Sequence, residues 1–207
     1  MVDKKRGSYN KIKKNAIRPG SLWPLVRQFA NQEAKPILEL TKNPKINAHH
    51  RKALMNYLVV RTVTIFEMFL LNEAHRLAKK DRRKTKKLFT HIQTNASIED
   101  QLISVYSFTK LSDVDHVFST LLDKKFLAEI KNQSIQYAPD YSYEPAHIPY
   151  TKPLHNNWDF VCKIFELRNG IVHHNRLVNF AKYSEIRNLI GGIIQFLMCS
   201  STVTDQN

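Results

Sequence analysis

A short stretch near the C-terminal end of the chain, FELRNGIVHHNRL at residues 165 to 177, carries side chains that could act on a phosphodiester. Treated as a helix with about 100° between successive residues, it places Asn169 and His173 about 40° apart on one flank. Glu166 falls on the same flank, and His174 lies on the other side. An imidazole can take or give a proton near neutral pH, and an amide can orient the groups around it. Together with a guanidinium that holds phosphate oxygens, these groups suffice for phosphodiester cleavage without a metal ion.

The arginine of this stretch, Arg168, lies in the middle of the apolar face of the predicted helix. Apolar side chains flank it within about 100° on both sides: Phe160, Val161, Ile164, Phe165, Leu167, Ile171 and Val172. A guanidinium stays charged, so this position requires a carboxylate, a phosphate or a wet cleft beside it. Spacing alone leaves two interpretations open. Arg168 is either a structural residue paired with Glu67 or Glu166, or a binding residue that lines a cleft.

A second feature is one long helix predicted from about residue 48 to residue 87. Its middle, LMNYLVVRTVTIFEMFLLNEA, is apolar almost all round, which predicts a central buried helix. Its end carries eight cations in twelve positions. Cations near a helix C-terminus compensate the helix dipole, but this number exceeds what a cap requires. The candidate nucleic-acid contacts are Arg76, Lys79, Lys80, Arg82, Arg83 and Lys84, together with Arg176 near the C-terminal end.

The composition indicates a helical protein that binds polyanions. The chain has 207 residues, of which 43% are hydrophobic and only 5 are glycine, and its apolar runs have helical spacing. Its net charge of +14 makes nucleic acid the expected partner class, ahead of an anionic membrane. The two cysteines, Cys162 and Cys199, lie in apolar helical segments, and no cysteine–histidine set has zinc spacing. We therefore expect reduced thiols, no native metal site and no cofactor.

The chain divides into an arm, one domain and a tail. Residues 1–20 carry seven cations against one acid, which predicts a flexible basic arm. A single helical domain is expected at 21–199, with a tyrosine- and proline-rich surface loop at 137–153 and a tail at 200–207. No apolar leader begins the chain, and the apolar run Leu54–Leu71 contains polar and charged residues that are costly in lipid. A cytoplasmic protein without a membrane partner is therefore expected.

The segment RNGIVHH, residues 168 to 174, resembles the Arg-x4–6-His signature of HEPN domains, which prefer a polar residue directly after the arginine. The match runs from Arg168 and Asn169 to His173, and His174 also fits the permitted spacing, so both histidines stay candidates. The upstream segment IFEMFLLNEA resembles the first core helix of this superfamily, which often carries a glutamate where Glu67 stands. The similarity covers roughly residues 48 to 199 and includes the order of the helices.

This resemblance implies an all-α, HEPN-like bundle of about five to seven helices with a long central helix. It also implies a two-fold dimer through the signature helix, in which two Arg/His sets form one composite cleft. In that cleft Arg168 would contact the scissile phosphate, and His173 or His174 would be the acid–base group. Asn169 would be the polar helper, and Glu67 and Glu166 would be supporting acids.

The function implied by the resemblance is a metal-independent endoribonuclease of a toxin–antitoxin or antiviral defence system. It would act as a homodimer on tRNA or another structured RNA and leave a 2′,3′-cyclic phosphate. The alternative is a non-catalytic HEPN module that binds RNA or nucleotides, or a scaffold, beside an antitoxin or within a larger defence complex. A sequence-specific DNA-binding protein is a third interpretation, but the chain shows no helix-turn-helix with its short glycine turn.

Overall fold

The structure is a computed structural model that describes residues 22–89, 96–137, 150–180 and 182–205. The arm predicted at 1–20 lies outside these described residues. So does the central part of the predicted tyrosine-rich loop, residues 138–149.

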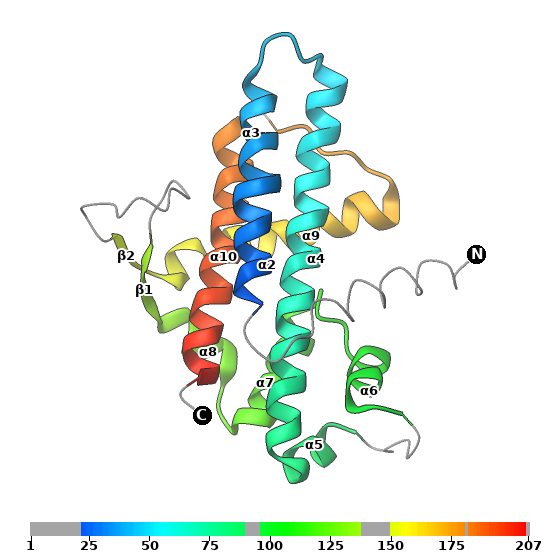
Figure 1. The fold of residues 1–207 in the computed structure, drawn as a ribbon, viewed down its shortest axis with the longest axis vertical. Helices are drawn as coiled ribbons and strands as arrows, with labels where there is room; N and C mark the ends of the chain where they lie inside the picture. The colour runs from blue at the N-terminus through cyan, green and yellow to red at the C-terminus, as the bar shows by residue number, and fades with distance from the viewer. Residues whose placement is uncertain (1–21, 90–95, 138–149, 181, 206–207) are drawn as a thin grey trace.

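The centre of the fold is α4 (Ala48–Lys80), a helix that is covered on nearly every side. Asn47 caps its first turn, because its side-chain oxygen accepts a hydrogen bond of 2.8 Å from the backbone N–H of His50. Six of its middle side chains have an exposed fraction of 0%: Leu58, Val59, Val63, Phe66, Leu70 and Ala74. The all-round apolar run therefore forms the buried central helix that the sequence predicts, with the other elements arranged around it (Figure 1).

One flank of α4 is covered by an antiparallel N-terminal segment. α2 (Trp23–Gln28) continues through a π-helical turn (Phe29–Ala34) into α3 (Lys35–Lys42). Arg61 of α4 donates from Nε and Nη2 to the two carboxylate oxygens of Glu33, at 2.8 and 2.9 Å. This bidentate ion pair fixes the π-helical turn against α4.

Two C-terminal helices complete the core around α4. α10 (Tyr183–Asp205) runs beside α4 in the same direction, and α9 (Trp158–His174) crosses behind both in Figure 1. The crossing is filled by aromatic rings, since Phe66 of α4 contacts Phe165 of α9 and Phe196 of α10, each at 4.9 Å between ring centroids. The first half of α9 is thereby fixed to the two longest helices.

The remaining described elements pack around the other end of α4 and beside α10. They are α5 (Arg82–Leu88), α6 (Ile98–Val105), α7 (Leu111–Leu122), α8 (Phe126–Asn132), a short antiparallel pair of strands, β1 (Ser134–Tyr137) and β2 (Tyr150–Pro153), and a 3-10 turn (Leu154–Asn157).

The helical architecture confirms the all-α prediction but differs in its subdivision. The described residues form more helical segments than the five to seven expected, and the β1–β2 pair interrupts them. The predicted long helix ends at Lys80 instead of continuing to Lys87. The Asp81 carboxylate accepts hydrogen bonds from the backbone N–H groups of Arg83 and Lys84, at 2.9 and 3.2 Å, and so begins a new helix.

The predicted boundary at residues 199 and 200 is also wrong. α10 continues to Asp205, because Val203 and Thr204 are 0% exposed and pack into the molecule. Arg76 of α4 holds this end as well, since its Nη2 lies 3.3 Å from the Asp205 carboxylate. Most of the predicted tail is therefore the last turn of a core helix.

Two helices, α4 and α10, are long and apolar enough to cross a membrane by length and composition. In each, 67% of the most apolar window is buried inside the molecule. The core helix of a soluble protein meets the same criterion, so length and composition alone assign neither helix to a membrane.

Candidate active site

α9 begins in the core and ends outside it. Val161 and Ile164 are 0% exposed, whereas Val172, two turns later, is 47% exposed. Figure 1 shows the C-terminal end of α9 extending beyond the edge of α4. Arg168 is half-buried and lies where the helix leaves the body of the molecule. The apolar stripe around Arg168 is thus a core face in its first part and an exposed face in its last part.

Three of the predicted catalytic residues lie together at this point. The Arg168 guanidinium donates from Nη1 to Asn169 Oδ1 at 3.2 Å, and the same nitrogen lies 3.2 Å from His173 Nε2. A guanidinium has only donors, so Nε2 accepts this hydrogen bond in the neutral tautomer that carries its proton on Nδ1. His174 is exposed, and no hydrogen bond joins it to Arg168 in the part of the chain that the structure describes.

Glu67 of α4 lies near the cluster without pairing with it. Burial raises the pKa of the Glu67 carboxyl to about 7, and the positive charge of Arg168 acts in the opposite direction. Among the described residues, no carboxylate lies within the 4.0 Å of an ion pair from the Arg168 guanidinium. A salt bridge to Glu67 or Glu166, the structural interpretation of Arg168, is therefore not formed. The guanidinium is accessible to an anionic ligand.

Glu67→Gln is expected to change how stability depends on pH. The folded-state pKa of Glu67 is raised from 4.5 to about 7, so the folded protein binds this proton more tightly than the unfolded chain. The free energy of unfolding of the wild type therefore falls as the pH rises from 4.5 to about 7. A neutral glutamine at this position removes that fall. The variant should gain up to about 3 kcal/mol relative to wild type between pH 4.5 and pH 8. Denaturant midpoints measured across this range check the result, and a difference that does not vary with pH would contradict it.

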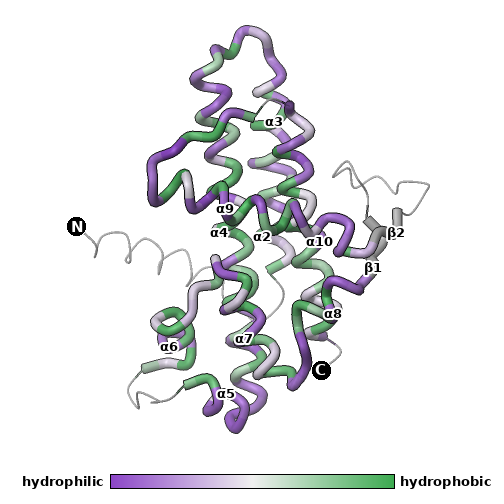
Figure 2. Tube along the Cα trace, turned by 180° about the vertical axis from the view of Figure 1, so that it is seen from behind, coloured by the Kyte–Doolittle hydropathy of each residue, from purple (hydrophilic) through white to green (hydrophobic). Residues whose placement is uncertain are grey.

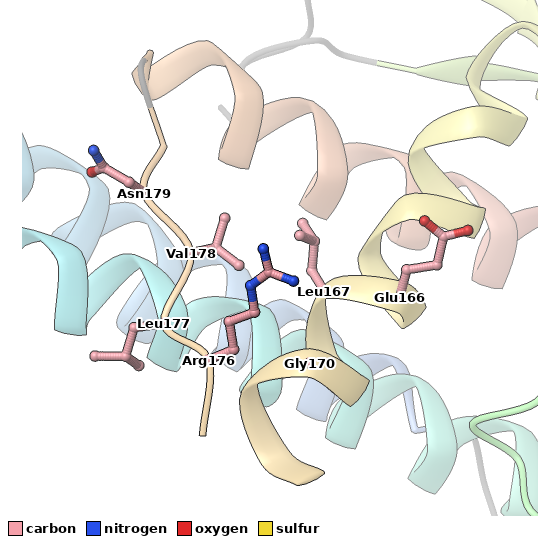
Figure 3. A pocket seen from close by; sticks show the side chains of 7 residues that line it. All are labelled: Glu166, Leu167, Gly170, Arg176, Leu177, Val178 and Asn179. Carbon is pink, nitrogen blue, oxygen red and sulfur yellow. The ribbon is translucent and has the colours of Figure 1, made fainter. Parts of the chain in front are cut away.

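A groove of about 380 Å³ lies between α9 and the segment that follows it. Its lining is mainly apolar and includes a few polar side chains (Figure 3). The apolar side chains are Leu167, Leu177 and Val178, and the polar ones are Glu166, Arg176 and Asn179. Gly170 leaves its wall open, because a Cβ built there would meet nothing within 4 Å. Glu166 and Arg176 therefore belong to this groove, whereas the predictions placed Glu166 with the catalytic group and Arg176 with the cations.

The segment that follows α9 is fixed in place by hydrogen bonds to its backbone groups. Asn175, in the left-handed region with φ 49°, ends the helix, and the Arg176 N–H donates to the Gly170 carbonyl at 3.1 Å. Asn56 of α4, which is 2% exposed, then holds Val178 by two hydrogen bonds. Asn56 Nδ2 donates to the Val178 carbonyl at 2.8 Å, and Asn56 Oδ1 accepts from the Val178 N–H at 2.9 Å. Asn56 thus fixes one wall of the groove to the central helix.

Asn56→Ala is expected to loosen this wall and to destabilise the protein. The change leaves the Val178 N–H and carbonyl without their side-chain partner, which costs about 2–3 kcal/mol. The denaturant midpoint should fall, and the Val178 amide should exchange its hydrogen much faster. Asn188→Ala, at an exposed position of α10, is the matched control and should change stability by less than about 0.5 kcal/mol. Unchanged exchange at Val178 would contradict the assignment.

Two of the predicted nucleic-acid-binding cations have structural partners instead. Arg76 Nη2 lies 2.7 Å from the Glu73 carboxylate and also binds the end of α10. Lys84 Nζ lies 2.8 Å from the Asp123 carboxylate. Their charges are largely compensated, because each is drawn to an acid that a neighbouring turn or helix brings close.

The other predicted cations at the junction of α4 and α5 are exposed: Lys79, Lys80, Arg82 and Arg83. In Figure 2 the chain at this junction is coloured mainly as hydrophilic residues. Lys80 follows Glu67 by thirteen residues on the same helix, which separates them by about 20 Å. The structure therefore places these cations at a distance from the Arg168 cluster.

Two features of the site were not predicted: the groove, and Asn56 as the residue that builds it. An asparagine inside an otherwise apolar helix was the available signal, since a buried amide needs partners. Across the described ranges, no group of three histidine, cysteine or acidic side chains is arranged to hold a metal ion. Comparison of the chain with protein-family models, with curated proteins and with solved structures finds no match in any of the three.

Proposed function

We propose that this protein is a metal-independent endoribonuclease of a toxin or antiviral defence system, and that it acts as a homodimer. The observation that carries the proposal is the 3.2 Å contact between Arg168 Nη1 and His173 Nε2, at an arginine with no acid in ion-pairing distance among the described residues. A permanent cation and a proton-accepting imidazole are thus juxtaposed on an exposed helix end. The resemblance of residues 168 to 174 to the HEPN signature adds the reaction class.

The proposed reaction uses only groups of this chain. When Arg168 turns from His173 to the phosphate, His173 Nε2 becomes free to take the proton of an RNA 2′-hydroxyl, and that oxygen forms a bond to the adjacent phosphorus. Arg168 holds the non-bridging oxygens while negative charge builds on them. The bond from phosphorus to the 5′-oxygen breaks, and the leaving oxygen takes a proton from His173 of the second subunit, which enters the reaction as an imidazolium protonated from solvent and leaves it neutral. The first His173 holds the proton it took from the 2′-hydroxyl, so the protons balance. The products are a 2′,3′-cyclic phosphate and a 5′-hydroxyl.

The dimer part of the proposal is supported by the apolar surface beside Arg168. Val172 lies about 40° from Arg168 around the helix and one turn further along it. It is 47% exposed, on the part of α9 that extends beyond α4. A second copy packed on Val172 would bring its own Arg168 and His173 to the same cleft. The composite site then explains why a cation lies within an apolar stripe.

RNA beyond the cleavage point would contact the exposed cations at the junction of α4 and α5. Lys79, Lys80, Arg82 and Arg83 have no ion-pair partner among the described residues, so they can bind phosphates. At about 20 Å from the cluster along α4, they would bind the RNA several nucleotides away. This spacing favours a structured RNA over a dinucleotide substrate.

The proposal is tested by incubating the purified protein with total RNA in EDTA and mapping the ends. We expect cleavage in EDTA with 2′,3′-cyclic phosphate ends, and a loss of about 10²-fold or more in His173→Ala. The loss in His174→Ala should be smaller, because His173 alone contacts Arg168. RNA that binds without being cut would support the non-catalytic HEPN module instead. Cleavage that requires a divalent cation would contradict the proposed chemistry.

A further inference from the structure

The groove beside α9 adjoins the Arg168 cluster on the surface of the same helix. Glu166 and Gly170, which line the groove, lie about 20–60° around the helix from His173. Gly170 is also one turn before His173 and His174, so the groove begins within one helical turn of His173. Groove and cluster are therefore neighbouring parts of one surface.

The lining of the groove matches a flat ring with polar edges. Figure 3 shows the Arg176 guanidinium between the side chains of Leu167 and Val178, with the Glu166 carboxylate beyond Leu167. The volume of about 380 Å³ lies within the range of small-molecule sites. Unpaired nucleobases bind proteins by stacking on apolar or guanidinium planes and by hydrogen bonds at their edges.

The two charged groups of the groove remain available to a ligand. Glu166 and Arg176 line the same space, yet they are not within ion-pairing distance of each other in the described structure. A carboxylate accepts hydrogen bonds from base N–H groups, and a guanidinium donates to base oxygen and ring nitrogen. Guanine offers both, with N1–H and N2–H donors on one edge and O6 and N7 acceptors on another.

We propose that this groove binds the base next to the cleaved phosphate, that guanine is the preferred base, and that the groove sets the sequence preference of cleavage. The inference rests on the proposed ribonuclease function only where its test measures cleavage. The binding arm stands independently of it, because a base can be bound without being cut.

Gly170→Leu tests the proposal by filling the groove. The added side chain meets nothing at its Cβ, and leucine favours a helix more than glycine, so the variant should fold. Asn188→Leu, an exposed position of α10 outside the groove, is the matched control. Arg176→Ala is a second variant, on an exposed side chain, should Gly170→Leu fail to fold.

The binding arm measures the affinity of the full chain for GMP and UMP by equilibrium dialysis. Wild type and Asn188→Leu should bind GMP about tenfold more tightly than UMP, and Gly170→Leu and Arg176→Ala should lose the difference. The cleavage arm uses four RNA oligonucleotides that differ only in the base beside one susceptible bond. Wild type should cleave the oligonucleotide with guanine beside the susceptible bond fastest, and Gly170→Leu should cleave all four oligonucleotides at similar rates.

The two arms separate the failure of the subsite from the failure of the proposed function. In one outcome, wild type binds GMP selectively, Gly170→Leu loses this binding, and wild type does not cleave RNA. That result would support the base site and contradict the ribonuclease function. Cleavage with no base preference, or a preference that Gly170→Leu and Arg176→Ala both retain, overturns the base site and keeps the ribonuclease. Tight GMP binding that guanine-containing RNA does not displace would identify a free nucleotide as the ligand and overturn the assignment to RNA.

Discussion

Arg168→Ala should lower RNA cleavage by about 10³-fold or more while the protein stays folded. A guanidinium that holds the oxygens of a phosphoryl group during reaction contributes effects of this size, because the charge it stabilises is largest in the transition state. The fold should tolerate the change, since Arg168 is half-buried and has no carboxylate partner to leave unpaired among the described residues. The measurement is the single-turnover cleavage rate in EDTA, together with the thermal midpoint of each variant.

Two further variants sharpen this result. Arg168→Lys keeps the charge but loses the planar donor pair, so it should recover only a small part of the activity. Arg27→Ala removes the same charge from an exposed position of α2 and should leave the cleavage rate near that of wild type. If Arg168→Ala and Arg27→Ala were to reduce cleavage equally, the effect would be one of net charge on RNA binding, and the assignment of Arg168 would be wrong.

The sequence predicted the central helix and the polar cluster for a clear physical reason. Both depend on periodicity within one helix, and the 3.6-residue turn converts spacing into faces. An apolar run on all sides buried α4, and Asn169 and His173, which the spacing places on one flank, each contact Arg168. The contact between Arg168 and His173 was less predictable, because side chains five apart are not usual neighbours on a helix. A long guanidinium and an imidazole at an exposed helix end can bridge this gap.

The elements that were not predicted depend on contacts between distant segments. Asn56 and Val178 are 122 residues apart, and nothing in either local sequence indicates that they pair. The break at Asp81 does not follow from the charge pattern, because the cations on both sides of Asp81 continue without interruption, while the Asp81 carboxylate caps a new helix. The extension of α10 to Asp205 likewise depends on partners in α4, such as Arg76. Periodicity identifies the faces of a helix but not the segment that covers them.

Val172→Asp is the second change with a large expected effect, and it acts on assembly. A two-fold interface brings the same patch of both subunits together, so an aspartate near the axis faces its own copy. The like charges and the loss of an apolar contact should shift the protein from dimer to monomer. Because the cleft is composite, cleavage should fall by about 10²-fold or more at low protein concentration and recover as concentration rises. Sedimentation velocity and cleavage rates over the same concentration series measure both.

Val105→Asp supplies the matched control for this prediction. It makes the identical change at a valine that is 57% exposed on α6, away from the end of α9, so both variants add one charge to an exposed apolar position. Only Val172→Asp should alter the oligomeric state, because only Val172 lies beside the cluster. A Val172→Asp protein that stays dimeric would place the interface elsewhere. A wild-type protein that cleaves RNA as a monomer would show that one Arg168–His173 pair suffices, and the apolar stripe around Arg168 would then need another explanation.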